Sequence, residues 1–317
     1  MDTLTDLLDG VRARGALIHQ AIMTSPWSLR FAGGAPLTLL TMLDGQAWII
    51  PPNGETAAIG PGDIAIVRGP ASYTVADNLV TPPQHVITSA YYCAATARAV
   101  ADDDLALDPR TCGVTETGSA ILLTGAYQGR GGISDRLLDA LPGILVVSDD
   151  ECRFPLLDLV AAEVVRDKPG QQAVLDRLLD LMLVSALRAW FDRPHTHAPV
   201  WYRVKDDAVV GAALRLMHGD PAHPWTVEGL ATEVGVSRAS LARRFTAEVG
   251  EPPISYLANW RMALAADLLR DTDITVGSIA RKVGYSGTFA LSVAFKRRLG
   301  ITPSQHRAAA PRDQRSG

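Results

Sequence analysis

The sequence predicts an α+β chain with an N-terminal antiparallel β-barrel, helices appended to it, and a C-terminal all-α domain with two helix-turn-helix motifs. Three observations predict this fold class. Short apolar segments separated by turns follow one another from about residue 15 to 90. After Gly132 the apolar residues recur at helical spacing. Residues 226–253 and 275–303 are two copies of one pattern.

The barrel is expected within residues 1–132. Its strand candidates are rich in Val, Ile, Leu, Thr and Trp, and the turns GGAP, PPNGE and GPGD lie between them. Closely spaced strands with such turns form an antiparallel sandwich or barrel. The candidates are residues 15–22, 27–32, 37–43, 46–50, 63–69, 73–77, 84–90 and 119–127.

Residues 133–191 are expected to be helical. Short helices are predicted at 133–141 and 155–166, and the longest follows Pro169–Gly170. Its apolar residues form a wide stripe at i, i+3 and i+4 spacing. That stripe fits packing onto the barrel and a homodimer interface equally well. Residues 192–201 contain two prolines and are expected to be a linker, whose His195 and His197 we interpret as solvated rather than as metal ligands.

The last part of the chain, residues 202–310, contains the duplication. In each copy a Thr (Thr226, Thr275) can cap a short helix, and a Gly (Gly235, Gly284) can end it in the left-handed conformation. A Ser (Ser237, Ser286) can then cap a second helix. The buried face of this second helix is expected to contain Leu241 and Phe245 in the first copy, and Leu291 and Phe295 in the second. This arrangement is the helix-turn-helix motif.

Charge is distributed unevenly along the chain. The formal net charge is −4, but residues 1–200 carry 14 basic and 23 acidic side chains, whereas residues 201–317 carry 16 and 11. Two helix-turn-helix motifs in a net-basic segment predict binding to double-stranded DNA.

The remaining bulk features exclude other classes. No apolar run reaches the roughly 18 residues needed to cross a membrane. The acidic N-terminus does not fit a secretory signal, so a cytoplasmic location is expected. The three cysteines, Cys93, Cys112 and Cys152, lack the spacing of a zinc cluster and are expected to be reduced.

Residues 202–307 resemble the DNA-binding domain of the arabinose-regulator (AraC/XylS) family of bacterial transcription regulators. The resemblance rests on SIARKVGYSGTFALSVAFKRRLGITPSQHR (278–307), preceded by RMALAADLLR (261–270). It implies that the second helix of each motif enters one of two successive major grooves. The residues then expected to contact bases are Arg238, Ala239, Ala242 and Arg243 in the first motif, and Thr288, Phe289, Ser292 and Val293 in the second.

The two motifs are not expected to read DNA alike. Arg243 matches a family position and can contact guanine O6 and N7, or alternatively a phosphate. Val293 occupies the corresponding position in the second copy, where the family commonly has Arg. The second helix is therefore expected to be the weaker reader, with Phe289 and Val293 meeting thymine methyl groups. Phosphate contacts are expected from Arg244, Lys296 and Arg297. Residues 255–270 are expected to form a helix that connects the two copies, and Arg261 in it is a candidate structural ion-pair partner.

The N-terminal part is similar to the cupin-type sensor domain of such regulators, through Gly60-Pro61-Gly62-Asp63 and the strand that follows. The His and Glu ligands of cupin enzymes are absent from the matching segments, so no metal, cofactor or catalytic residue is assigned. His19 and His85 lie in strand candidates and are interpreted as core or rim residues rather than as ligands.

Three possibilities for the function of the N-terminal part stay open. The resemblance implies a small-molecule effector inside the barrel, with Trp27, Trp48 and Tyr73 as pocket residues. The alternatives are a barrel that binds no ligand and only dimerises or contacts RNA polymerase, and a cupin-type metalloenzyme fused to a DNA-binding domain.

Overall fold

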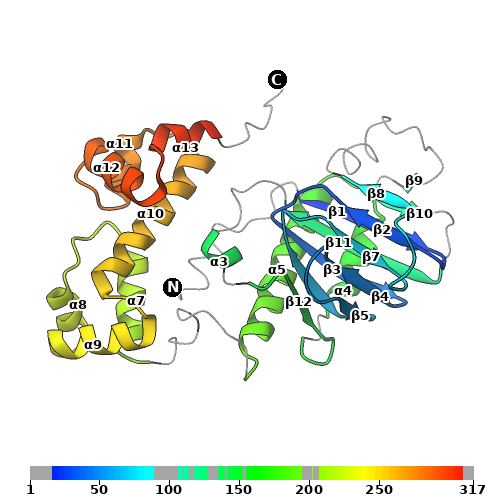
Figure 1. Cartoon of the computed structure of the whole chain (residues 1–317), viewed down its shortest axis with the longest axis horizontal. Helices are drawn as coiled ribbons and strands as arrows, with labels where there is room; N and C mark the ends of the chain where they lie inside the picture. The colour runs from blue at the N-terminus through cyan, green and yellow to red at the C-terminus, as the bar shows by residue number, and fades with distance from the viewer. Residues whose placement is uncertain are drawn as a thin grey trace. The chain divides into compact units, whose positions relative to one another are not determined.

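The computed structural model describes residues 16–88, 106–108, 110–113, 118–127, 135–139, 141–152, 155–194, 202 and 207–309. The chain forms two compact units (Figure 1). The β unit contains the sheets and the helices α4 (Leu157–Val164) and α5 (Gln171–Phe191). The helical unit contains α7 to α13. The short helix α3 (Asp135–Asp139) lies at the division between them in the sequence.

The described strands of the β unit form two sheets. The first has seven strands in the order β12-β6-β3-β11-β1-β10-β9, and the second has five in the order β5-β4-β7-β2-β8. The bounds are β1 (Leu17–Met23), β2 (Ser28–Phe31), β3 (Leu37–Asp44), β4 (Ala47–Ile50), β5 (Ala57–Ile59), β6 (Ile64–Arg68), β7 (Tyr73–Ala76), β8 (His85–Ile87), β9 (Ala106–Asp108), β10 (Thr111–Gly113), β11 (Ala120–Tyr127) and β12 (Ile144–Val147).

The predicted α+β class is confirmed, but the barrel is not closed. Among the described strands no ladder joins the two sheets, which pack face to face as a sandwich. The edge strands β5, β8 and β9 have three residues each, so they offer few backbone groups to extend a ladder. Pairing is mostly antiparallel, as expected, although β1 with β10 and β2 with β8 run parallel.

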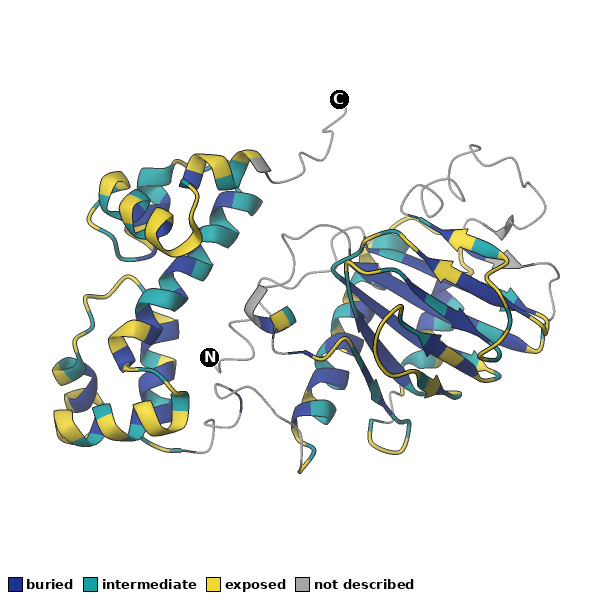
Figure 2. Ribbon diagram, in the orientation of Figure 1, coloured by how far each residue is buried: buried dark blue, intermediate teal, exposed yellow. Residues whose placement is uncertain are grey.

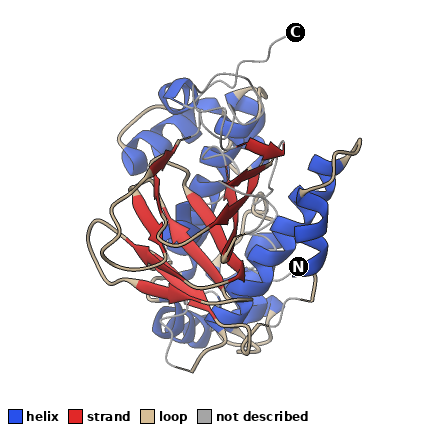
Figure 3. Cartoon of the chain, turned by 90° about the vertical axis from the view of Figure 1, so that its right-hand side faces the viewer, coloured by secondary structure: helices blue, strands red, loops and turns tan. Residues whose placement is uncertain are grey.

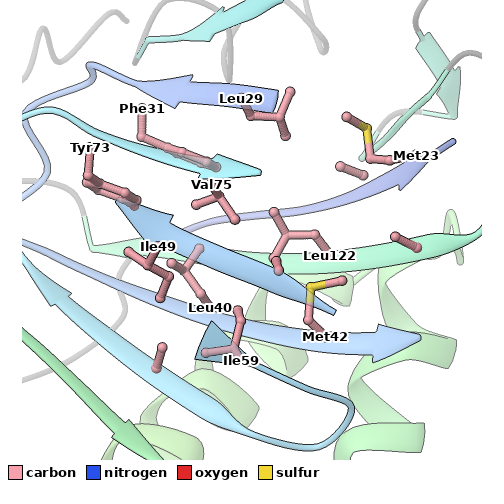
Figure 4. Packing of buried hydrophobic residues seen from close by; sticks show 14 of the residues in the cluster. Met23, Leu29, Phe31, Leu40, Met42, Ile49, Ile59, Tyr73, Val75 and Leu122 are labelled. Carbon is pink, nitrogen blue, oxygen red and sulfur yellow. The ribbon is translucent and has the colours of Figure 1, made fainter. Parts of the chain in front are cut away.

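The core of the β unit lies between the two sheets. Alternate residues of each strand point inward, as the pleat requires. Figure 4 shows Leu40, Met42 and Leu122 of the larger sheet facing Ile49 and Val75 of the smaller one. These side chains are fully buried.

The other face of the larger sheet packs against α5, which runs alongside the strands (Figure 3). A Cβ atom added at Gly125 of β11 would lie 2.4 Å from Leu179 Cδ1, so strand and helix meet closely there. The hydroxyl of Tyr127 donates a hydrogen bond to the carbonyl oxygen of Leu179 at 3.2 Å. The apolar stripe predicted for this helix is buried at Leu175, Leu178, Leu179, Met182, Leu183, Ala186 and Leu187.

The helical unit is built around α10 (Pro253–Asp271), which is mostly buried or half-buried along its length (Figure 2). The other helices are α7 (Val210–Gly219), α8 (Val227–Glu233), α9 (Arg238–Val249), α11 (Val276–Lys282), α12 (Thr288–Leu299) and α13 (Pro303–Ala309). The pairs α8–α9 and α11–α12 coincide with the two copies predicted from the sequence.

Candidate nucleic-acid interface

The first helix-turn-helix motif consists of α8 and α9. Thr226 caps α8 by accepting a hydrogen bond from the amide of Gly229 at 2.9 Å, and Ser237 caps α9 by accepting one from Ser240 at 3.2 Å. Gly235 lies between the helices with φ +72°, a conformation that few residues other than glycine adopt. These caps and this turn are as the sequence predicts. The caps and the turn fix the position of α9 relative to α8.

The outer face of α9 carries the predicted base-contacting residues. Leu241 and Phe245 are fully buried against the rest of the motif. On the opposite side Arg238, Ala239 and Arg243 are exposed and Ala242 is half-buried. Two guanidinium groups thus stand beside two small side chains, an arrangement that lets the helix backbone approach a base edge while the arginines donate hydrogen bonds.

The second motif, α11 and α12, repeats this plan with one difference. Thr275 caps α11 by accepting a hydrogen bond from Ser278 at 3.2 Å, and Gly284 has φ +79°. The N-cap of α12, however, is Gly287, which has no side chain to accept a hydrogen bond. The expectation that Ser286 caps this helix is therefore wrong. The second copy has one residue more than the first between the Ser and the buried Leu, and this residue, Gly287, takes the cap position itself.

The outer face of α12 is less polar than that of α9. Phe289 is 83% exposed and Val293 is 53% exposed, whereas Leu291 and Phe295 are fully buried. Thr288 is exposed and Ser292 is half-buried on the same outer side. A phenyl ring left in water at this level is unusual for a helix that already has a buried face. Large exposed apolar groups of this kind mark binding surfaces.

The three predicted phosphate-contacting residues differ in their surroundings. Lys296 and Arg297 are exposed near the end of α12. Arg244 instead forms an ion pair with Asp207, at 2.8 Å between Nη2 and Oδ2. The amide of Val210 and the Arg244 guanidinium hold the pKa of the Asp207 carboxyl below its ordinary value. This pair joins α9 to the start of α7, so a phosphate at Arg244 would compete with a carboxylate.

Two arginines of this unit bind backbone carbonyl oxygens. Arg261 of α10 donates to the carbonyls of Pro221 and His223, each at 2.7 Å. Sequence reasoning expected a carboxylate partner for it, but its hydrogen bonds in the structure are to these two oxygens. Arg307 of α13 donates to the carbonyls of Leu269 and Ile274 at 3.2 and 2.6 Å. The acceptors lie more than 30 positions away in the chain, so no local pattern could have revealed them.

Comparison with known proteins identifies the family. A cupin family model matches residues 2–192, and a helix-turn-helix domain model matches residues 230–309. The chain is 32% identical to an AraC-like transcription regulator of Streptomyces lividans, an alignment that covers 97% of this chain and 98% of that protein. This chain belongs to the AraC-like transcription regulators.

Two further relatives agree with this assignment. An AraC-like transcription regulator of Streptomyces antibioticus is 30% identical, over 97% of this chain and 98% of the relative. The transcriptional regulator AlkR of Acinetobacter baylyi is 26% identical, over 97% and 99%. The predicted combination of a cupin domain with a DNA-binding helix-turn-helix domain is confirmed, and the names of the relatives support a regulator rather than an enzyme.

The β unit of this AraC-like regulator places the three expected pocket residues differently. Trp27 and Tyr73 are buried in the core between the sheets, and Tyr73 stacks on Phe31 with ring centroids 5.0 Å apart (Figure 4). Burial raises the pKa of Tyr73 above its ordinary value. Trp48 is 36% exposed, because its neighbours Ala47 and Ile49 take the inward positions of β4. Trp48 therefore does not line the interior, contrary to the expectation.

The two histidines of the strand candidates, His19 and His85, lie on different sheets. His19 is buried on β1, and His85 is half-buried on β8. Burial lowers the pKa of His19 to about 4. Over the described ranges, no group of three His, Cys, Asp or Glu side chains is arranged to hold a metal ion. His195 and His197 lie outside those ranges. Among the described helices, none is long and apolar enough to cross a membrane.

Proposed function

We propose that this AraC-like regulator reads its operator mainly through α9, with α12 as an apolar second reader. The observation that carries the proposal is the contrast between the two exposed faces: Arg238 and Arg243 on α9, against Phe289 and Val293 on α12. A bidentate arginine–guanine pair discriminates against a wrong base by about 1–3 kcal/mol. Contact with a thymine methyl group has no such directionality.

The proposed assignment of the remaining residues follows from position. Ala239 and Ala242 permit close approach to the bases, and Thr288 and Ser292 supply shorter polar contacts. Lys296 and Arg297 neutralise phosphates beside the second groove. We assign Arg244 a smaller part in phosphate binding because Asp207 already holds its guanidinium.

The test compares single alanine variants of the full-length protein. A preferred operator is first selected from random DNA with the wild-type protein, and the selection is repeated with Arg243→Ala, Thr288→Ala and Ser292→Ala. Arg243→Ala should relax the preference at one or two guanine positions, by roughly 5- to 150-fold in affinity ratio. Lys168→Ala, at an exposed lysine outside the helical unit and before α5 begins, is the control. Equal or greater relaxation by Thr288→Ala or Ser292→Ala would reverse the proposed ranking.

We also propose that α5 contributes to a homodimer. Its buried stripe is used by the sheet, yet Val174 and Leu181, seven residues apart on one helical face, remain 42% and 44% exposed. Residues at this spacing suit pairing with a second copy of the helix. Leu181→Asp should then convert a dimer into a monomer in sedimentation experiments, whereas Lys168→Asp, at an exposed residue before α5 begins, should not. A wild-type protein that sediments as a monomer would disprove the dimer.

The regulatory part of the proposal assigns the β unit to control. The cupin match over residues 2–192 supports a small-molecule effector bound by the β unit. Contact with RNA polymerase belongs to the proposal because the relatives are named transcription regulators. A protein with these partners acts in the cytoplasm. If no small molecule shifts operator affinity or thermal stability of the full chain in a metabolite screen, the effector is excluded from this proposal.

A further inference from the structure

One helix, α10, belongs to the hydrophobic cores of both helix-turn-helix motifs. Its first half supplies Tyr256, whose ring meets that of Phe245 of α9 edge-on with centroids 5.7 Å apart. It also supplies Trp260, which stacks on His218 of α7 with ring centroids 4.1 Å apart. Its second half begins with Met262, which packs in the core around Ile279 and Phe295 of the second motif. Arg261 lies between Trp260 and Met262, at the point where α10 passes from one core to the other.

Arg261 reaches from this point to the loop between α7 and α8. Its two hydrogen bonds, to the carbonyls of Pro221 and His223, are charge-assisted and therefore among the stronger ones in a protein. Partial burial lowers the pKa of Arg261 below its ordinary value.

The loop is shaped to present those carbonyls. The carboxylate of Asp220 accepts a hydrogen bond from the amide of His223 at 3.0 Å, and the backbone oxygen of Asp220 accepts one from the indole of Trp225 at 2.9 Å. The amide of Trp225 also donates to the His223 carbonyl at 2.8 Å. The loop between α7 and α8, which leads into the first motif, is thus an ordered acceptor for Arg261.

The turn of the second motif meets the same point. A Cβ atom added at Gly284 would lie 2.8 Å from Arg261 Cζ and 2.9 Å from the carbonyl oxygen of Ala222. At Gly235, the matching glycine of the first motif, no atom lies within 4 Å of such a Cβ. The duplication therefore does not explain the crowding at Gly284. The crowding arises because the loop between α7 and α8, Arg261 and the second motif's turn come together.

We propose that Arg261 is a positioning residue that fixes the two reading helices, α9 and α12, at one angle and separation. It thereby sets the spacing that the regulator accepts between two half-sites, which are the DNA segments contacted by α9 and by α12 of one subunit. The inference rests on the proposed function of those helices. Each added base pair rotates one half-site by roughly 35° and moves it by about 3.4 Å relative to the other. A rigid joint cannot follow that displacement, whereas a loosened joint can follow it in part.

The experiment measures affinity of the full-length protein for the selected operator and for operators with one base pair inserted or deleted between the half-sites. The wild type should lose on the order of tenfold or more at the altered spacings, because one helix then loses its base contacts. Arg261→Ala should bind the native spacing more weakly, and its ratio between native and altered spacing should fall toward about 1–3, since its helices are free to adjust.

Arg307→Ala is the matched control. Arg307 also donates to two backbone carbonyls, but one is at the end of α10 and the other is in the loop before α11, so neither belongs to the loop between α7 and α8. Its loss should lower thermal stability and leave the spacing ratio as in the wild type. Arg261→Gln, which keeps one hydrogen-bond donor group, serves if Arg261→Ala does not fold, and it should give an intermediate ratio.

The possible outcomes separate the two proposals. If the wild-type protein selects an operator and folded Arg261→Ala or Arg261→Gln keeps the wild-type spacing ratio, the positioning role is overturned while the reading proposal stands. The same holds if Arg307→Ala flattens the spacing dependence as much as the Arg261 variants. If the wild-type protein selects no sequence at all, the proposed function fails and the positioning role fails with it.

Discussion

At the scale of single residues, neighbouring arginines of this protein have different partners. Arg243 extends from the exposed face of α9, while the adjacent Arg244 turns toward Asp207 of the preceding segment. Successive helix positions differ by about 100° around the axis, so adjacent side chains need not share a surface. The count of basic residues therefore overstates how many are available to DNA.

The two turn glycines provide a prediction at this scale. Gly235 and Gly284 both have positive φ, but only Gly284 is crowded by backbone. Gly235→Ala should cost about 1–2 kcal/mol in the free energy of unfolding, which is the cost of the left-handed conformation. Gly284→Ala should cost more, because the added methyl group also meets the Ala222 carbonyl. Denaturant unfolding of the two full-length variants and the wild type, followed by circular dichroism, measures both losses of stability. Equal losses would contradict the crowding at Gly284.

At the scale of elements, the sequence pattern located most helices and strands but not their detailed ends. Short apolar segments separated by turns predicted eight of the strands. β5, β9, β10 and β12, with three or four residues each, were not among the predicted strands. The duplication located α8, α9, α11 and α12 correctly. It misplaced the cap of α12, because aligning Ser286 with Ser237 ignores the inserted Gly287.

The site shows the same division between local and distant information. The helical period predicts which residues of α9 and α12 are buried, and their exposed faces follow from that pattern. The hydrogen bonds of Arg261 do not, since Pro221 and His223 precede it by about 40 positions. Trp48 was misplaced for a simpler reason. An aromatic residue in a strand was assumed to face inward, although its apolar neighbours Ala47 and Ile49 already occupy that face.

The helix caps provide a prediction at the element scale. Ser237→Ala removes the hydroxyl that accepts from Ser240, so it should cost about 1 kcal/mol of stability. Ser286→Ala should cost close to nothing, because Gly287 is the N-cap of α12. Thermal unfolding of the two variants beside the wild type makes the comparison. A loss for Ser286→Ala as large as that for Ser237→Ala would mean that Ser286 caps α12 in solution.

At the scale of the whole molecule, charge divides the chain by function. Residues 1–200 are net acidic and residues 201–317 are net basic. The acidic part does not suit binding to a polyanion, so we expect contact with DNA to be concentrated on the helical unit, which contains the two proposed reading helices. Phosphate contacts made there release condensed counterions, and this makes affinity depend on salt.

The salt dependence provides the last prediction. Each lost phosphate contact should reduce the slope of log affinity against log salt concentration by about 0.9. Lys296→Ala and Arg297→Ala should therefore each lower the slope by nearly one, and the double variant by nearly two, with similar losses on cognate and unrelated DNA. Arg244→Ala should change the slope less, because Asp207 shares its guanidinium. Titrations of the full-length protein at several salt concentrations, with Lys168→Ala as control, measure these slopes. An unchanged slope for Lys296→Ala and Arg297→Ala, or a larger change for Arg244→Ala, would move the phosphate contacts from the end of α12 to α9.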